Sequence, residues 1–322
     1  MKLLVTGATG FLGSTLVPLL LEQGHSVRAL QRGEVSIAGA EVLKGDVRDE
    51  GTVRKALEGI EGVYHLAGLV SRDPRDARKM YELHVDGTRL LLAEAERAGV
   101  HRVVLASSSG TVGVSRTRRV AVETDDYPIE TVGRWPYYLS KIYEEKVAIE
   151  ASKRLPVVIL NPSLLLGPGD SRLSSTQDVF RFLQDRIPAT PRGGLSFVDV
   201  RDAAAAFVAA LTKGNVGERH FLGGANFEFD DFFARLARIA HQPQPRLGPL
   251  PASLQIAGAH LMERIARARG REPGLPASDV EMGQCWFFID SSKAERVLGF
   301  RARDPLETLS ETVRYVREHF IA

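Results

Sequence analysis

Three glycines spaced three residues apart follow a short apolar strand near the start of the sequence. Residues 4–13 read Leu-Val-Thr-Gly-Ala-Thr-Gly-Phe-Leu-Gly, and an apolar helical pattern continues after them. Gly7 allows a tight turn out of the strand, Gly10 lets a pyrophosphate approach the backbone, and Gly13 lets the following helix pack closely on the sheet. The N–H groups and positive dipole of that helix N-terminus attract phosphate. The pattern therefore predicts a dinucleotide-binding site.

The composition of the 322 residues excludes several other classes of protein. The formal net charge is +2, so no strong electrostatic field indicates a nucleic-acid partner. The single cysteine, Cys285, excludes a disulfide framework, and no spacing of acidic or histidine residues indicates a metal site. No window approaches the roughly 18 uninterrupted apolar residues of a membrane span. The first strand leaves no room for a signal peptide, so we expect a cytoplasmic protein.

Strand and helix patterns alternate through the first half of the sequence, and the strands are continuous apolar runs typical of a parallel sheet buried on both faces. We expect strands at 27–30, 41–43, 62–66, 103–106 and 157–160, and helices at 53–57, 81–98 and 138–151. The rhythm changes after the Gly-Pro-Gly sequence at 167–169. Later we expect a strand at 195–200, a helix at 203–211, a proline-rich loop at 242–251, a helix at 252–268 and a strand at 286–289.

The predicted fold class is therefore α/β, a Rossmann doubly wound parallel sheet with a small C-terminal substrate-binding lobe. The nucleotide-binding domain is expected at 1–165, with 196–222 returning to it. The lobe is expected to consist mainly of 166–195 and 223–322.

A tyrosine and a lysine four residues apart form the second informative pattern. Pro136 suits the first turn of a helix, which places Tyr137 and Lys141 on one face. An ammonium group beside a phenol lowers the pKa of the phenol, so Tyr137 could give a proton to a carbonyl oxygen or take one from an alcohol. Tyr138 points to an adjoining side. The alternative is a half-buried surface pair without chemistry, and the preceding glycine pattern favours the catalytic interpretation.

Three serines follow the strand expected at 103–106. Side chains at the carboxyl ends of parallel strands face the ligand, and a hydroxyl group there can donate a hydrogen bond to a developing oxyanion. Spacing does not decide which of Ser107, Ser108 and Ser109 would do so. The run could equally be a polar end of the strand.

Together these motifs resemble the extended short-chain dehydrogenase/reductases, the NAD-dependent epimerase/dehydratase family. The matching segments, in order and over nearly the whole sequence, are the glycine motif, His65-Leu66-Ala67-Gly68, the serine run, Tyr137-x-x-x-Lys141, Asn161-Pro162-Ser163, Phe197-Val198-Asp199-Val200-Arg201-Asp202 and Ser291-Ser292-Lys293-Ala294. The sequence looks most like the dihydroflavonol-reductase and 3β-hydroxysteroid-dehydrogenase branch, and within it like bacterial hopanoid-associated epimerase-like proteins. Alignment with that branch selects Ser108 as the catalytic serine, whereas alignment with sugar epimerases selects Ser109.

The resemblance implies roles for particular residues. Tyr137 would be the general acid/base, Lys141 would hold the nicotinamide ribose and tune the tyrosine, and a serine would orient the substrate oxygen. A homodimer through the helices at 81–98 and 138–151 is implied by the family alone. The expected cofactor-binding residues are Thr6, Gly7, Gly10, Phe11, Leu12, Gly13, Arg32, Asp46, Val47, Leu66, Ala67, Gly68, Tyr137, Lys141, Asn161, Pro162 and Ser163.

The end of the second strand bears on which dinucleotide is bound. No carboxylate is present there to bind a ribose 2′-hydroxyl, whereas Arg32, with help from Arg28, could pair with a 2′-phosphate. NADP(H) is therefore favoured over NAD(H), and a solvated loop arginine is the alternative. Asp46 and Val47 resemble the family's adenine contact, which does not discriminate between the two.

Three functions are open at this point. The first is an NADP(H)-dependent ketone or aldehyde reductase, or alcohol dehydrogenase, acting on a small molecule with a carbonyl group or secondary alcohol. The second is a nucleotide-sugar epimerase with tightly bound cofactor. Sugar enzymes of the family usually have an arginine where this sequence has Leu195-Ser196, which disfavours this function. The arginines at 264–271 could nevertheless bind a diphosphate. The third is a non-catalytic NADP-sensing regulator, which the Tyr-Lys pair disfavours.

We expect the helix at 252–268 to pack into the core of the lobe, with membrane-surface binding as the weaker alternative.

Overall fold

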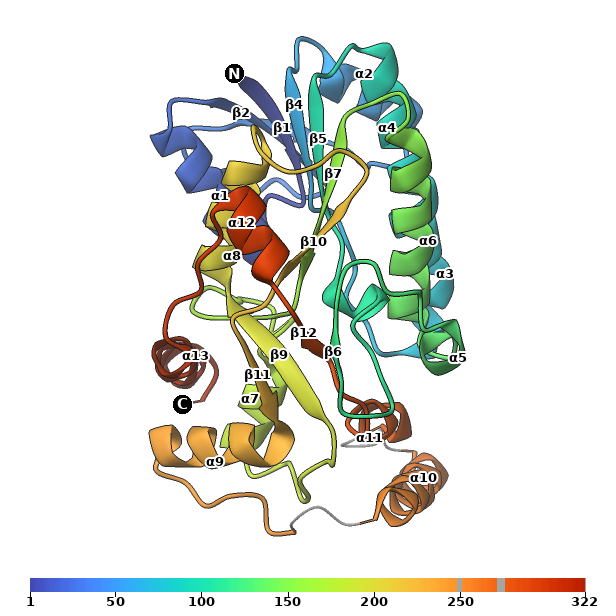
Figure 1. Cartoon of the computed structure of the whole chain (residues 1–322), viewed down its shortest axis with the longest axis vertical. Coiled ribbons are helices and arrows are strands. Elements are labelled where there is room, and N and C mark those ends of the chain that lie inside the picture. The colour runs from blue at the N-terminus through green and yellow to red at the C-terminus, as the bar shows by residue number, and fades with distance from the viewer. Residues whose placement is uncertain (248–250, 271–275, 322) are drawn as a thin grey trace.

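The computed structural model describes residues 1–247, 251–270 and 276–321, and Figure 1 shows how its elements are arranged. The strands are β1 (Lys2–Thr6), β2 (Ser26–Gln31), β3 (Glu41–Lys44), β4 (Gly62–His65), β5 (Arg102–Ala106), β6 (Val120–Ala121), β7 (Val157–Pro162), β8 (Leu164–Leu166), β9 (Gly194–Asp199), β10 (Arg219–Leu222), β11 (Ala225–Glu228) and β12 (Phe288–Ile289). The helices are α1 (Phe11–Glu22), α2 (Glu50–Leu57), α3 (Ala77–Tyr81), α4 (Thr88–Arg97), α5 (Ile129–Val132), α6 (Pro136–Ala151), α7 (Gln177–Leu183), α8 (Val200–Ala210), α9 (Phe229–Ala240), α10 (Ala252–Ala268), α11 (Ala277–Met282), α12 (Ser292–Leu298) and α13 (Pro305–Phe320), with short turns η1 (Pro74–Asp76), η2 (Glu82–Gly87) and η3 (Ser109–Thr111).

Seven parallel strands form the main sheet, in the order β10-β7-β5-β4-β1-β2-β3. After β1, the strands β2 and β3 are added on one side of the sheet, and β4 and the later strands are added on the other side. The carboxyl ends of β1 and β4 therefore flank the point at which such sheets bind ligands. In the register of these two strands, Thr6 lies opposite His65. The predicted doubly wound α/β fold is confirmed.

Helices cover both faces of this sheet because successive strand residues point to opposite sides. Leu3 and Val5 of β1 lie in a core with α1, α8 and α12, whereas Leu4 lies in a second core with α2, α4 and α6. Burial on both faces explains why the strands read as uninterrupted apolar runs.

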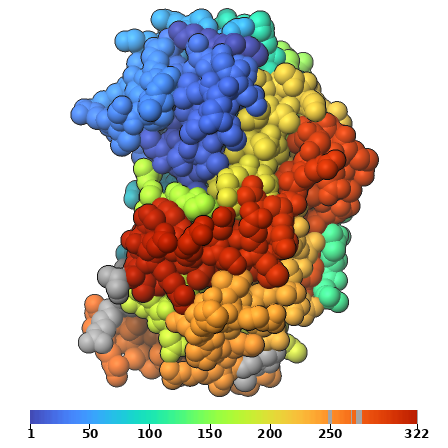
Figure 2. All heavy atoms as spheres, turned by 90° about the vertical axis from the view of Figure 1, so that its left-hand side faces the viewer, coloured from blue at the N-terminus to red at the C-terminus, as the bar shows by residue number. Residues whose placement is uncertain are grey.

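A smaller lobe is built around the sheet β11-β9-β8, whose apolar side chains form a third core with α7, α9 and α13. In Figure 1 this lobe lies below the main sheet, with α10 and α11 at its lower right. Figure 2 shows the C-terminal segment, in red, between the blue N-terminal domain and the orange α9. None of the helices in the described part of the chain combines the length and apolar character that crossing a bilayer requires.

Several boundaries differ from the sequence-based expectations. The helix expected at 81–98 contains a π-helical turn, η2, which the 3.6-residue periodicity does not reveal. Residues 196–199 pair within the small sheet as part of β9, so the chain returns to the main sheet only with α8. The strand expected at 286–289 is reduced to β12, beside β6. Part of the loop at 242–251, and Arg271, lie outside the described residues.

Candidate active site

The glycine motif lies at the carboxyl end of β1. Gly7 has a positive φ of 72°, and a Cβ atom there would lie 2.7 Å from the Leu66 carbonyl carbon. A Cβ atom on Gly13 would lie 2.2 Å from the carbonyl oxygen of Gly7. The loop is therefore pressed against both the helix that follows it and the strand end beside it, and only glycine fits these two positions.

The N-terminus of α1 suits an anion. Its N-cap, Gly10, has no side chain to accept the first backbone N–H groups, and the first turn contains no acidic residue. Phe11 and Leu12 are buried, so their side chains anchor the helix while the N-terminal backbone remains available. A helix end of this kind fits the pyrophosphate of a dinucleotide. The glycine loop and the N-terminus of α1 therefore fit the expected dinucleotide cofactor.

The expected adenosine-binding residues lie at the ends of β2 and β3. Arg32 is exposed, and its charge helps to lower the pKa of Asp46, after the larger contribution of hydrogen bonds from Arg48. Arg32 has no hydrogen-bond or ion-pair partner among the described residues. Val47 is buried nearby, with 5% of its surface exposed.

Arg28 does not assist Arg32, contrary to the sequence-based expectation. It is buried in β2, where its guanidinium donates hydrogen bonds to the carbonyls of Ala56 and Glu58 at 2.9 and 3.0 Å. It also pairs with Glu41 at 2.9 Å. Because these contacts tie Arg28 to β3 and the end of α2, its role is structural.

A buried histidine connects the end of β1 with α4. The backbone N–H of Ala67 donates to the Thr6 hydroxyl at 3.2 Å, and the same hydroxyl lies 2.7 Å from Nδ1 of His65. Nε2 of His65 lies 2.8 Å from the Thr88 hydroxyl. Burial lowers the pKa of His65 to about 3, so the ring is neutral. These contacts pack His65 at the end of its strand.

Tyr137 and Ser108 are brought together from different elements. Tyr137 is in the first turn of α6, and Ser108 caps η3 after β5. Burial raises the pKa of Tyr137 to about 12, while a hydrogen bond with the Ser108 side chain acts in the opposite direction. Ser109 is buried in η3 and does not contribute to this shift. Ser108 is therefore the serine that acts on the phenol.

Lys141 lies one helical turn further along α6, with its ammonium group turned toward acceptors of the protein. Its Nζ atom donates to the carbonyl of Ala106 at 2.9 Å and to Glu144 at 2.7 Å. A Cβ atom on Gly68 would lie 3.8 Å from that Nζ, so the lysine borders the loop after β4. The expected lowering of the pKa of Tyr137 by Lys141 is not found, because burial dominates and the ammonium is paired with Glu144.

Glu144 is a site residue that sequence reasoning missed. It is completely buried, and it also accepts a hydrogen bond from the Thr88 hydroxyl at 3.2 Å. Since Thr88 donates to Glu144, it must accept from Nε2 of His65, and His65 must then accept from Thr6 through Nδ1. A directed chain of hydrogen bonds therefore runs from the end of β1 to the carboxylate that holds Lys141. In the sequence, the only signal for Glu144 was its position three residues after Lys141.

His84 is a second residue that the sequence did not single out. It lies in η2, where Nε2 accepts from the backbone N–H of Leu69 at 2.9 Å, so Nδ1 donates to the Ser140 hydroxyl at 2.8 Å. Its ring also meets Tyr137 edge to face, with centroids 6.0 Å apart. His84 thus fixes the loop after Gly68 relative to the first turns of α6.

The Asn161-Pro162-Ser163 segment lies at the end of β7, as expected, but its asparagine faces the interior. Asn161 is fully buried and donates to the carbonyl of Ser108 at 3.1 Å and to Glu145. Its side chain therefore supports the serine loop, whereas the resemblance implied that this segment lines the nicotinamide. Ser163 donates to the Leu222 carbonyl at 3.1 Å, which fixes β7 to β10.

Aromatic and apolar side chains surround Tyr137 on the side of the lobe. Its ring centroid lies 5.2 Å from that of Tyr138, which in turn lies 5.9 Å from that of Phe287. Trp135 and Cys285 are buried in the same cluster. This wall is suited to an apolar molecule.

An arginine close to Tyr138 is neutralised. Arg72, in the loop after β4, pairs with Asp178 of α7 at 2.9 Å and with Asp279 of α11 at 3.1 Å. Arg181 shares both carboxylates, at 3.2 and 2.9 Å. Two cations and two anions leave no net charge there to attract a diphosphate. Within the described residues, no group of three or more His, Cys, Asp or Glu side chains could hold a metal ion.

Fold and site together define a dinucleotide-binding α/β enzyme of the doubly wound type. The model of the NAD dependent epimerase/dehydratase family matches residues 3–223. The chain belongs to this family, and it is therefore an NAD(P)-dependent enzyme of the extended short-chain dehydrogenase/reductase type.

Individual relatives match over almost the whole chain. A Synechocystis protein provisionally named a dihydroflavonol 4-reductase is 34% identical over 98% of this chain and 94% of its own. Sterol demethylase protein B of Methylococcus capsulatus is 34% identical over 99% of both chains. The crystal structure of gox2253 is similar with a TM-score of 0.85 and 31% identity over 99% of both chains.

Proposed function

We propose that this protein is an NADP(H)-dependent oxidoreductase that reduces a ketone or aldehyde, or oxidises the corresponding alcohol. The observation that supports this most directly is the position of Tyr137, where the Ser108 side chain acts to lower the pKa of the phenol, one helical turn from the buried Lys141. A donor phenol, an orienting hydroxyl and a fixed cation are the groups that carbonyl reduction requires.

Each of these groups has a defined task in the proposal. Ser108 orients the substrate oxygen by a hydrogen bond, and Tyr137 gives that oxygen its proton or removes it in the reverse reaction. Lys141, which borders the loop at Gly68, binds the ribose hydroxyls of the cofactor. The nicotinamide, when bound, supplies or accepts the hydride. Ser109 is the alternative to Ser108 and lies one residue further from the end of β5.

The preference for NADP(H) over NAD(H) rests on Arg32. It is exposed at the end of β2, where its guanidinium is free to pair with a 2′-phosphate. The side chain of Asp46 is engaged by Arg48 at 2.7 Å. No carboxylate ends β2 to repel a phosphate.

The proposed substrate is a small, largely apolar molecule with a carbonyl group or secondary alcohol. The aromatic wall beside Tyr137 and the neutralised Arg72 support this substrate over a sugar nucleotide. The names of the two sequence relatives, a dihydroflavonol reductase and a sterol demethylase protein, agree with apolar substrates. The alternative is a nucleotide-sugar epimerase, in which the cofactor is reduced and reoxidised within one turnover.

The decisive experiment follows NADPH consumption with a panel of carbonyl compounds and with UDP-sugars. The Tyr137→Phe variant is expected to lose about 10²–10⁴-fold in kcat because it cannot transfer the proton, while it still binds the cofactor. Tyr138→Phe, which removes the same atom from the next residue of α6, is the matched control and should remain active. Full activity of Tyr137→Phe would refute the assigned chemistry, and sugar interconversion without net NADPH consumption would establish the epimerase.

We also propose a homodimer formed through α3, η2, α4 and α6. A surface groove lies between these elements, and Tyr81 and Tyr143 at its edge are 43% and 40% exposed. Aromatic residues of this kind are typical of interfaces. Light scattering of the wild type and a Tyr143→Glu variant tests the proposal, since the variant should be monomeric if the interface lies there.

A further inference from the structure

Several polar side chains of the amphipathic helix α10 contact the rest of the protein. Gln255 donates to the Thr190 carbonyl at 3.3 Å, and Glu263 accepts from the backbone N–H of Ala277 at 3.4 Å. His260 lies 3.6 Å from Glu281 of α11. These polar contacts help to hold the helix against the lobe.

Four of the five large apolar side chains of α10 point outward, whereas the fifth, Ile256, is half-buried. Leu254, Leu261, Met262 and Ile265 are 62%, 58%, 66% and 37% exposed. Spacings of three, four and seven residues place them on one face of the helix, together with the exposed Ala257 and Gly258. The sequence-based expectation that this helix packs into the core of the lobe is therefore wrong. A monomeric protein rarely leaves such a row uncovered.

Basic residues accompany this row. Arg264 flanks it, and Arg269 follows the end of the helix; both are exposed, and neither has an ion-pair partner among the described residues. The acidic residue of α10, Glu263, lies on the opposite face, toward Ala277. An exposed apolar face bordered by arginines is complementary to a bilayer surface, where apolar side chains enter between the headgroups and arginines meet phosphates.

We propose that α10 docks the protein on the surface of a bilayer that contains anionic lipids. The apolar row formed by Leu254, Leu261, Met262 and Ile265 would enter the headgroup region, with Arg264 and Arg269 beside lipid phosphates. This inference is independent of the proposed reaction, because it uses none of the residues around Tyr137.

A second copy of the chain fits this face less well. The 17 residues of α10 make it about 25 Å long, so one face about 10 Å wide offers on the order of 250 Å². A stable interface between proteins buries about 800 Å² on each side. A bilayer has no such minimum area and can bind a single helix face.

The test is sedimentation of the full chain with vesicles of phosphatidylcholine, with and without phosphatidylglycerol. The wild type should bind the vesicles that contain phosphatidylglycerol. The double variant L261E/M262E should lower that binding by about tenfold or more, because two charged groups replace side chains that would be buried in the lipid. Arg264→Glu should weaken binding to the anionic vesicles in particular. Because all three side chains are exposed, the thermal unfolding temperature of the variants should match that of the wild type.

Leu306→Glu is the matched control, since Leu306 is an exposed helical leucine of α13, 45% accessible, away from α10. It should bind like the wild type. The proposal is overturned if the wild type binds neither kind of vesicle, or if L261E/M262E binds as the wild type does. It is also overturned if the wild type is a dimer in solution that L261E/M262E separates into monomers, since a second copy would then cover the face.

Discussion

Lys141 is held by acceptors that belong to the protein itself. Spacing along a helix predicts that Tyr137 and Lys141 share a face, and both do lie in the first turns of α6. Spacing cannot predict where a flexible ammonium group points, because that depends on carboxylates brought in by packing. Glu144 accepts a hydrogen bond from the Lys141 ammonium, and Glu144 is buried against Thr88 of α4. Recognition of the motif therefore indicated the proposed reactive groups but missed the partner of Lys141.

Glu144→Gln tests how far this carboxylate tunes the site. Burial raises the pKa of Glu144 to about 7, although Lys141 acts in the opposite direction. Below this pH the carboxyl group is neutral and no longer pairs with the ammonium. The wild type should therefore show an acidic limb near pH 7 in its kcat/KM profile, and the variant should lack it.

The same substitution changes how stability depends on pH. The folded-state pKa of Glu144 lies above the unfolded value of 4.5, so its contribution to stability is present below pH 4.5 and is lost as the pH rises toward about 7. Glu144→Gln should remove this loss in thermal unfolding measured across the range. Glu150→Gln, on the exposed part of α6, is the control. In the kinetic experiment, an acidic limb of the kcat/KM profile that persists unchanged in Glu144→Gln would contradict the assignment of that limb to Glu144.

Arg32→Ala addresses the choice of cofactor. Loss of a charged hydrogen bond to the 2′-phosphate should weaken NADPH binding by about 10- to 100-fold and leave NADH binding almost unchanged. Titration of protein fluorescence with both cofactors measures the effect. Lys44→Ala removes a neighbouring exposed charge at the end of β3 and should alter neither affinity. Equal weakening of NADPH and NADH would rule out recognition of the 2′-phosphate by Arg32.

At the scale of elements, continuous apolar runs predicted the strands of the main sheet because burial on both faces leaves that signature. Elements held by long-range polar contacts were less predictable. The outward apolar face of α10 depends on where its polar residues find partners, and Gln255 contacts Thr190 and Gln284, which are distant from it in sequence. The pairing of β9 with the small sheet likewise depends on β8 and β11, which had no clear pattern of their own.

The glycine loop and α1 form the element whose fit is tightest. Gly13→Ala should separate α1 from the loop, since the new Cβ would lie 2.2 Å from the Gly7 oxygen and 2.8 Å from the Ala8 Cα. We expect a loss of about 1–3 kcal/mol in unfolding free energy and markedly weaker dinucleotide binding. Urea unfolding and cofactor titration measure the two effects. Gly33→Ala, where a Cβ would meet nothing within 4 Å, should be nearly silent, and similar behaviour of the two variants would contradict the steric argument.

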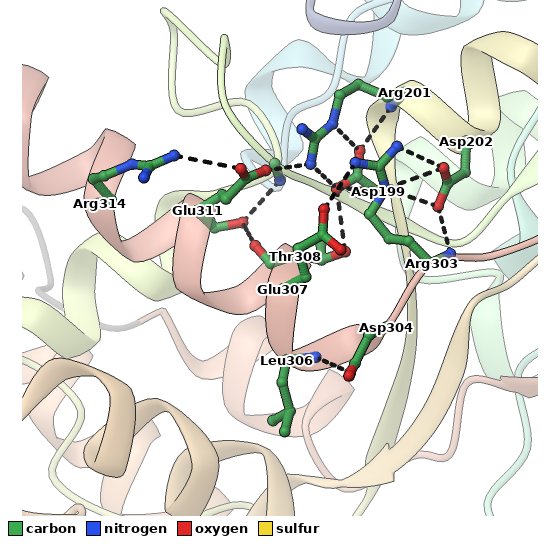
Figure 3. A network of polar contacts seen from close by, with 12 residues as sticks. Asp199, Arg201, Asp202, Arg303, Asp304, Leu306, Glu307, Thr308, Glu311 and Arg314 are labelled. Atoms are coloured by element: carbon green, nitrogen blue, oxygen red, sulfur yellow. Dashed lines mark hydrogen bonds and ion pairs between the residues drawn. The ribbon is translucent and has the colours of Figure 1, made fainter.

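At the scale of the molecule, a polar network joins the start of α8 to α13 (Figure 3). The buried Asp199 accepts hydrogen bonds from Arg201 at 2.9 and 2.7 Å and from Thr308 at 3.1 Å. Arg303 lies 3.5 Å from the same carboxylate and pairs with Asp202 at 2.8 Å. The segment at 197–202 was recognised only as a family motif. Its partners are about 100 residues away in sequence, so no local pattern could indicate its role as a junction.

Asp199→Asn should therefore destabilise the whole molecule. Removing one charge from a fully buried pair costs about 3–5 kcal/mol, and the cost here should be smaller because Arg201 and Arg303 are 33% and 25% exposed. Burial tends to raise the pKa of Asp199, but hydrogen bonds from Arg201 outweigh it and hold the pKa below 3.8. The stabilisation is thus present above pH 3.8 and is lost as the pH falls through the lower folded-state value. Urea unfolding at neutral and acidic pH measures both effects.

Asp185→Asn provides the control for this prediction. Asp185 pairs with Arg246 at 2.7 Å at the surface, where the two side chains are 58% and 80% exposed. Breaking that pair should change the unfolding free energy by less than about 1 kcal/mol. If the two aspartate variants were equally stable, Asp199 would have no special part in joining α8 to α13.

The hydrogen bonds from Ala67 to Glu144 cross four elements, β1, β4, α4 and α6, and all donate in one direction. To reverse this polarity, two hydroxyl groups would have to rotate and His65 would have to change tautomer in the same event. Above the pKa of Glu144, the fold therefore fixes the direction of these hydrogen bonds up to the carboxylate that pairs with Lys141. A molecule that binds beside Lys141 therefore meets an ammonium group that already donates hydrogen bonds to Ala106 and Glu144.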